Sequence, residues 1–161
     1  MTRPESGPLL SPGFWLHHAA LTWRAELDGR LRTLGLTHTQ FMVLASASWL
    51  EHVEGPPTQQ AVADHAGSDR MMTSRVIRAL ADAGFLERHP DPDDARAVRV
   101  AVTAAGRDVA ARAVEQAQAV DRLYFGDDPA DSAEMRQALR TMAGRRPAAG
   151  RTAPRSVGST P

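Results

Sequence analysis

The 161-residue sequence predicts a mainly α-helical fold with one small β-hairpin. Apolar residues recur every three or four positions over most of the chain, which indicates amphipathic helices. The period changes to two at Val98, Val100 and Val102, which is typical of a β-strand. Apolar residues make up 42% and charged residues 24% of the chain, the composition of a globular domain and not of a disordered one.

Two predicted helices precede a Gly-Pro-Pro break at residues 55–57. The first ends before Gly35, and its apolar stripe consists of Leu16, Ala20, Trp23, Leu27, Leu31 and Leu34. The second is capped by Thr37. Its apolar face consists of Phe41, Leu44, Ala45, Ser48 and Trp49.

Two shorter helices follow, separated by little more than a glycine turn. We expect Thr58 to cap residues 59–66, Gly67 to close that helix, and Ser68 to cap residues 69–83. This spacing is typical of a helix-turn-helix.

The β-hairpin is expected next along the chain. Its strands are residues 85–89 and 98–102, and an eight-residue turn rich in Asp and Pro joins them. Thr103 is then expected to cap a long helix that ends at Gly126 and carries Val109, Ala113, Ala117, Val120 and Tyr124. A last helix begins at Asp128-Pro129 and carries Met135, Leu139 and Met142.

Composition and charge exclude several classes of function. The chain has no Cys, which excludes disulfides, thiolate metal sites and thiol nucleophiles. Its net charge is zero, so overall charge gives no indication of nucleic-acid binding. Residues 145–161 carry four Arg and no acid, and we expect them to form a disordered basic tail. Residues 1–13 are expected to form a flexible arm.

No apolar run approaches the roughly 20 residues that a membrane helix needs. The first residues also lack the basic and then apolar pattern of a secretory signal. We therefore expect no membrane partner and a cytoplasmic location.

The helix predicted over residues 69–83 places Arg on its exposed face. Its apolar sector contains Thr73, Val76, Ile77, Leu80 and Gly84. The opposite side carries Met71, Ser74, Arg75, Arg78 and Asp82, with Arg70 on the flank. The major groove of DNA accepts a helix, and Arg suits bidentate contacts with guanine or phosphate. On an isolated helix the same pattern is more often an ordinary solvated face, so the DNA interpretation depends on the hairpin.

The predicted turn of the hairpin ends in Arg96. An Arg at a projecting tip fits the narrow, electronegative minor groove beside a helix in the major groove. We expect Asp94 to hold the Arg96 guanidinium in place. An ordinary polar loop with a local ion pair is equally compatible with this segment.

Several runs resemble the winged helix of the MarR family of bacterial transcriptional regulators. They are Thr58–Gly67, Met72–Leu80 and Gly84–Arg88, with Asp91–Arg96 and Val100–Gly106 matching the wing and its junction with the next helix. The resemblance implies a winged helix-turn-helix DNA-binding domain over residues 37–102 and a helical dimerisation region over residues 14–36 and 103–144. It therefore implies a homodimer joined through its N- and C-terminal helices.

The resemblance also implies a function. Such a protein is a sequence-specific regulator, more often a repressor than an activator, that binds palindromic double-stranded DNA and is often released by a small aromatic effector. The family's DNA-contacting positions fall on Thr58, Gln59, Arg70, Met71, Ser74, Arg75, Arg78, Asp94 and Arg96.

An effector pocket is the less specific part of this interpretation. Its candidate lining residues are Trp15, His18, Met42 and Trp49, together with Trp23, although such residues more often form core. The six His show no metal-ligand spacing, so neither a metal nor another cofactor is expected. No phosphate loop or nucleophile motif indicates an enzyme. The alternative function is a winged-helix protein-interaction module that binds no DNA.

Overall fold

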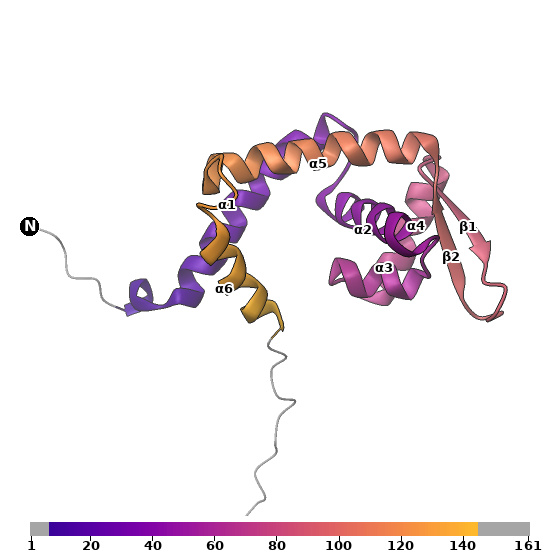
Figure 1. Cartoon of the computed structure of the whole chain (residues 1–161), viewed down its shortest axis with the longest axis horizontal. Coiled ribbons are helices and arrows are strands. Elements are labelled where there is room, and N and C mark those ends of the chain that lie inside the picture. The colour runs from indigo at the N-terminus through magenta and orange to yellow at the C-terminus, as the bar shows by residue number, and fades with distance from the viewer. Residues whose placement is uncertain (1–6, 145–161) are drawn as a thin grey trace, which may run out of the picture. The chain divides into compact units, whose positions relative to one another are not determined.

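The computed structural model describes residues 7–144 (Figure 1). In chain order its elements are the 3₁₀ turn η1 (Gly7–Leu10), α1 (Pro12–Arg32), α2 (His38–Glu54), α3 (Gln59–Ala66), α4 (Arg70–Asp82), β1 (Leu86–Pro90), β2 (Val98–Val102), α5 (Ala104–Phe125) and α6 (Ala133–Gly144). The chain divides into two compact units at Tyr124, and α6 belongs to the second unit. The predicted mainly helical fold with one hairpin is confirmed.

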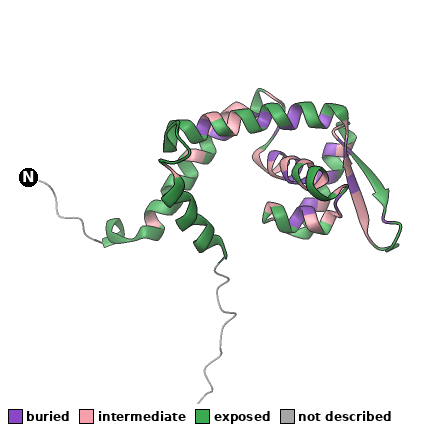
Figure 2. Ribbon diagram, viewed as in Figure 1, coloured by how far each residue is buried: buried purple, intermediate pink, exposed green. Residues whose placement is uncertain are grey.

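The hydrophobic core lies in the first unit and joins α2, α3, α4 and the hairpin to parts of α1 and α5 (Figure 2). Its fully buried members include Leu27, Leu31, Leu44, Val62, Ile77, Leu80, Val100 and Val120. Only the C-terminal half of the predicted α1 stripe is buried, because Leu16 remains exposed while Leu27 and Leu31 are enclosed.

Local caps define the helix-turn-helix. The Thr58 hydroxyl accepts a hydrogen bond from the Ala61 N–H at 3.1 Å and begins α3. Gly67 ends α3 in the left-handed conformation (φ 62°), which glycine adopts more easily than residues with a Cβ atom. The cap expected at Ser68 is wrong by one residue, because the Asp69 carboxylate accepts the Met71 and Met72 N–H groups. A carboxylate at this position also stabilises the positive end of the helix dipole.

The hairpin is antiparallel, with Leu86 opposite Val102 and Pro90 opposite Val98. Its first strand starts one residue later than expected, because the Phe85 N–H still closes the end of α4 by donating to the Leu80 carbonyl. The linker before α3 pairs with the other side of β2, where the Val100 N–H donates to the Pro57 carbonyl at 2.8 Å. The hairpin is therefore fixed to the segment that leads into α3.

The junction between β2 and α5 is tightly packed. The Thr103 N–H donates to the Phe85 carbonyl at 3.1 Å, and the Thr103 hydroxyl donates to the Gly84 carbonyl at 2.7 Å. At Gly106 an added Cβ would lie 2.0 Å from the Phe85 carbonyl oxygen, so only glycine fits. The first turn of α5 thus lies directly against the turn between α4 and β1.

The two ends of the described chain differ from expectation. Within the arm predicted over residues 1–13, Gly7–Leu10 form a 3₁₀ turn and α1 begins at Pro12. Ser11 caps α1 by accepting the Phe14 N–H, and Pro at the first position already has a helical φ. Helix α6 begins at Ala133, later than expected from Asp128-Pro129. The predicted basic tail lies outside the described residues.

Trp49 corrects the predicted core face of α2. The apolar pattern predicts that Trp49 faces the core, but its side chain is 58% exposed, while Val43 and Ala47 are fully buried. The buried face of α2 is therefore rotated away from Trp49. Within residues 7–144, no helix is both long and apolar enough to cross a bilayer.

Candidate nucleic-acid interface

Helix α4 presents a basic face to solvent. Thr73, Ile77 and Leu80 fix its orientation because all three are buried in the core. The opposite face consists of Arg70, Met71, Ser74, Arg75 and Arg78, of which only Ser74 is partly buried. Met71 is 69% exposed. An exposed thioether beside guanidinium groups is a surface that can contact both thymine methyls and polar base edges.

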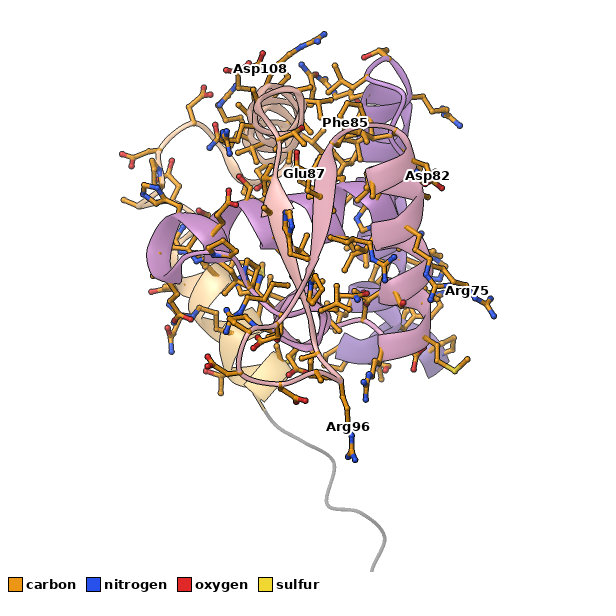
Figure 3. All side chains as sticks on the ribbon, turned by 90° about the vertical axis from the view of Figure 1, so that its right-hand side faces the viewer. Arg75, Asp82, Phe85, Glu87, Arg96 and Asp108 are labelled. Atoms are coloured by element: carbon orange, nitrogen blue, oxygen red, sulfur yellow. The ribbon has the colours of Figure 1, made fainter. Side chains whose placement is uncertain are left out.

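The Arg side chains of this face carry charge that the described part of the protein does not neutralise. Arg70, Arg75 and Arg78 form no ion pair with any residue between positions 7 and 144. Figure 3 shows Arg75 pointing away from the protein. Their guanidinium groups are therefore available to phosphates or bases.

The start of α3 holds the two other predicted contact residues of the helix-turn-helix. The Thr58 hydroxyl is used as the helix cap, and as an acceptor it keeps its own O–H free to donate. Gln59 is partly buried, and its side-chain oxygen is buried without a hydrogen-bond partner among the described residues. Of the two, Thr58 is thus better placed to donate to a phosphate.

Arg96 lies at the projecting tip of the hairpin, and its side chain points into solvent (Figure 3). The expectation that Asp94 holds its guanidinium is wrong. The Asp94 carboxylate instead accepts the backbone N–H of Arg96 at 2.9 Å. An Asp side chain two residues before an N–H favours this local turn. Asp94 therefore shapes the backbone of the tip, and the Arg96 guanidinium has no ion-pair partner within the described chain.

Two further residues, Asp91 and Arg99, hold the wing in place. Asp91 accepts the N–H groups of Asp93 and Asp94 at 2.8 and 3.1 Å. Its carboxylate also pairs with the Arg99 Nε at 2.7 Å, and Arg99 donates through Nη1 to the Pro56 carbonyl at 2.8 Å. Arg99 thereby connects the wing loop to the linker that precedes α3.

The environment of Asp91 favours its ionised form. The hydrogen bond from the Asp93 N–H lowers the pKa of Asp91, and the Asp94 N–H and Arg99 act in the same direction against the opposing effect of burial. The sequence assigned no role to Asp91 or Arg99. An acid at the start of the turn and an Arg among the valines of β2 were the available signals, but their pairing depends on the hairpin register.

The residues predicted to line an effector pocket are not brought together. Met42 packs against the core, whereas Trp15 donates its indole N–H to the Leu9 carbonyl and contacts Phe14 edge to face. His18 lies 4.3 Å from the Phe14 ring, between ring centroids. These residues therefore do not form one pocket in the described chain.

Trp49 lines a different hollow, a groove of about 640 Å³ between α2 and α5. Its neighbours there include His52 on α2 and Arg107, Ala111 and Val114 on α5. An exposed indole, apolar side chains and a guanidinium form a lining that suits a small aromatic anion. No group of three or more His, Asp or Glu between residues 7 and 144 lies close enough to hold a metal ion.

Comparison with known proteins identifies this arrangement. The MarR family profile matches residues 36–98. The HTH-type transcriptional regulator YdcH of Bacillus subtilis is 33% identical over 120 residues, which cover 74% of this chain and 82% of the relative. The HTH-type transcriptional repressor Rv2887 of Mycobacterium tuberculosis is 31% identical over 110 residues, covering 68% of this chain and 76% of the relative.

A solved structure agrees over nearly the whole chain. Bordetella bronchiseptica BpsR, whose DNA binding is regulated by 6-hydroxynicotinic acid, superposes with a TM-score of 0.76 at 25% identity. The match covers 89% of this chain and all of BpsR. The relatives are transcriptional regulators and not enzymes. Together with the exposed basic face of α4 and the projecting wing, these similarities show that the chain belongs to the MarR family of winged-helix, DNA-binding transcriptional regulators.

Proposed function

We propose that this protein is a ligand-responsive repressor that binds a pseudo-palindromic operator as a homodimer in the cytoplasm. Each subunit places α4 in the major groove and the wing tip in the adjacent minor groove. The residues proposed to contact DNA are Thr58, Arg70, Met71, Ser74, Arg75, Arg78 and Arg96, with Gln59 and Asp94 in supporting positions. Repression is the role named for the relative Rv2887.

The observation that carries the proposal is that two exposed basic features without acidic partners among the described residues, the α4 face and Arg96 at the wing tip, lie on one domain. The α4 face and Arg96 both extend into solvent, and the Asp91–Arg99–Pro56 connection holds the wing against the linker to α3. Because groove contacts require fixed spacing between a helix and a wing, this connection favours sequence-specific binding over diffuse charge attraction.

Exposed apolar side chains support the homodimer. Helix α1 exposes three large apolar side chains, those of Trp15, Leu16 and Leu21. Several such side chains on one helix indicate an interaction surface. The last turn of α5 exposes Leu123, Tyr124 and Phe125, and α6, which has no buried residue, exposes Met135, Leu139 and Met142. These side chains give the N- and C-terminal helices apolar surfaces that a second subunit would cover.

We place the ligand in the groove between α2 and α5. Its indole, Trp49, offers a stacking surface and Arg107 a positive charge, which together suit a small aromatic acid. The related regulator BpsR responds to 6-hydroxynicotinic acid, a ligand of that chemical class. Binding would favour a dimer whose two α4 helices are spaced wrongly for the operator.

The test compares operator affinity for Arg96→Ala with that for a control, Arg112→Ala. Arg112 is exposed on α5 and forms no ion pair among the described residues. The operator would be selected from randomised duplexes with the wild-type protein, and binding measured by fluorescence anisotropy at fixed salt. We expect Arg96→Ala to lose about 1–3 kcal/mol of binding free energy and Arg112→Ala to bind like the wild type.

Two results would contradict the proposal. If Arg96→Ala binds the operator as tightly as the wild type, the wing does not contact DNA. If the wild-type protein selects no duplex from the pool, the alternative of a protein-interaction module is favoured instead.

A further inference from the structure

The last residue of β2, Val102, is held by side chains from two different helices. Its N–H donates to Glu51 Oε1 of α2 at 3.0 Å. Its carbonyl accepts a hydrogen bond from Nη1 of Arg107 on α5 at 2.6 Å. The same Arg107 nitrogen lies 3.4 Å from Glu51 Oε2, which closes a three-membered network.

The carboxylate in this network is partly buried. The Glu51 side chain is 20% exposed, whereas that of Arg107 is 57% exposed. An ion pair between two exposed side chains contributes little, but a partly buried carboxylate that also accepts a backbone N–H is held firmly. The Glu51–Arg107 clamp, as we call this pair with Val102, is therefore more than an incidental surface contact.

The clamp lies at the one covalent connection between the wing and α5. On the other side of this junction, Thr103 and Gly106 fix the chain to the turn between α4 and β1. Among the described residues, Glu51 is the only residue of α2 whose side chain forms hydrogen bonds with this junction. The direction in which α5 leaves the winged helix thus depends on contacts with both α2 and the α4–β1 turn.

We propose that the Glu51–Arg107 clamp sets the half-site spacing that the dimer accepts on DNA. This inference rests on the proposed function, in which terminal helices join two winged domains. Helix α5 has 22 residues and so extends about 33 Å at 1.5 Å per residue. A tilt of about 6° at its base displaces the far end by about 3.4 Å, the rise of one base pair in a duplex with 10–10.5 base pairs per 34–36 Å turn.

The clamp also borders the groove assigned to the ligand, since Glu51 and Arg107 both line it. An anion in the groove would compete with Glu51 for Arg107. Release of Glu51 would then change the direction of α5 and with it the spacing of the two α4 helices. This is the mechanism by which a bound ligand would alter DNA binding.

The experiment measures affinity for three duplexes that carry the selected operator with its natural half-site spacing, one base pair more and one fewer. The wild type should lose at least tenfold in affinity on either altered duplex. Glu51→Ala and Arg107→Ala should bind the natural duplex more weakly and discriminate among the three by less than threefold. Glu51→Gln keeps an oxygen for the Val102 N–H, so it should show intermediate discrimination.

A matched control separates the clamp from a general loss of stability. Arg30→Ala removes another ion pair, the one between Arg30 Nε and Glu26 Oε1 at 2.9 Å on α1, and should keep the wild-type discrimination. Thermal unfolding would identify any variant that fails to fold, and Arg107→Ala tests the clamp independently of Glu51→Ala.

The outcomes distinguish failure of the clamp inference from failure of the proposed operator-binding function. If the folded Glu51 and Arg107 variants lose affinity by the same factor on all three duplexes, the clamp does not set spacing and the inference is wrong. If the wild-type protein itself shows no spacing dependence, the dimeric operator-binding function fails.

Discussion

Replacing Gly106 with Ala is expected to destabilise the protein although alanine is a better helix former. The added Cβ would lie 2.0 Å from the Phe85 carbonyl oxygen and 2.9 Å from its carbon, whereas ordinary contact begins at 3.4 Å. The first turn of α5 and the α4–β1 turn must therefore separate by about 1.4 Å in that direction. This movement also pulls on the hydrogen bond from the Thr103 N–H to the same carbonyl.

The magnitude follows from three opposing effects. Overpacking at a close contact costs about 1–3 kcal/mol, and weakening the Thr103–Phe85 hydrogen bond costs about 0.5–1.5 kcal/mol. The higher helix propensity of Ala returns about 0.5–1 kcal/mol. We expect a net loss of about 0.5–4 kcal/mol, which lowers the Tm by about 1–16 °C for a chain of this size.

Urea unfolding followed by Trp fluorescence would measure this loss, with all variants at the same concentration because dimerisation adds to apparent stability. Gly29→Ala is the matched control, because Gly29 lies inside α1 and the nearest atom to its added Cβ is the end of the Arg32 side chain at 3.9 Å. That control should gain about 0.5–1 kcal/mol. If Gly106→Ala is as stable as the wild type or more so, the close contact between α5 and Phe85 is wrong.

Two further substitutions test the wing and the recognition helix. Arg75→Ala should lose about 1–3 kcal/mol on the operator and less on random duplex if Arg75 reads a base, and equal losses on both would assign it to phosphate. Asp91→Asn should lower the urea midpoint at pH 7. The lowered pKa of Asp91 means that its ionised form stabilises the fold fully above its ordinary value of 3.8, and that this contribution is lost as pH falls through the folded-state pKa. The difference in urea midpoint between Asp91→Asn and the wild type should therefore vanish in strong acid. The control Asp93→Asn changes an exposed side chain and should match the wild-type midpoint both at pH 7 and in acid. A difference between Asp91→Asn and the wild type that persists in acid would contradict this account.

The local features of the fold were accessible from the sequence because they depend on neighbouring residues. Thr37 and Thr58 cap their helices as expected, since a hydroxyl needs only the N–H three residues ahead. The exposed face of α4 was likewise predictable, because Thr73, Ile77 and Leu80 repeat at helical spacing and must face the core. The expected cap at Ser68 was wrong because Ser68 and Asp69 are adjacent and both are common N-cap residue types. Capping propensity alone does not decide between them.

The contacts that position the candidate site depended on the tertiary structure. Asp91 meets Arg99 only because the hairpin register brings them together, and Glu51 meets Val102 only because α2 packs beside the end of β2. Trp49 shows the same limit, since helical periodicity identifies a face but not how wide a part of it the neighbouring helices cover. The sequence by itself therefore determined which side chains of α4 face solvent, because that follows from helical periodicity. The residues that orient this surface are far apart in the sequence, and they become neighbours only when the core packs.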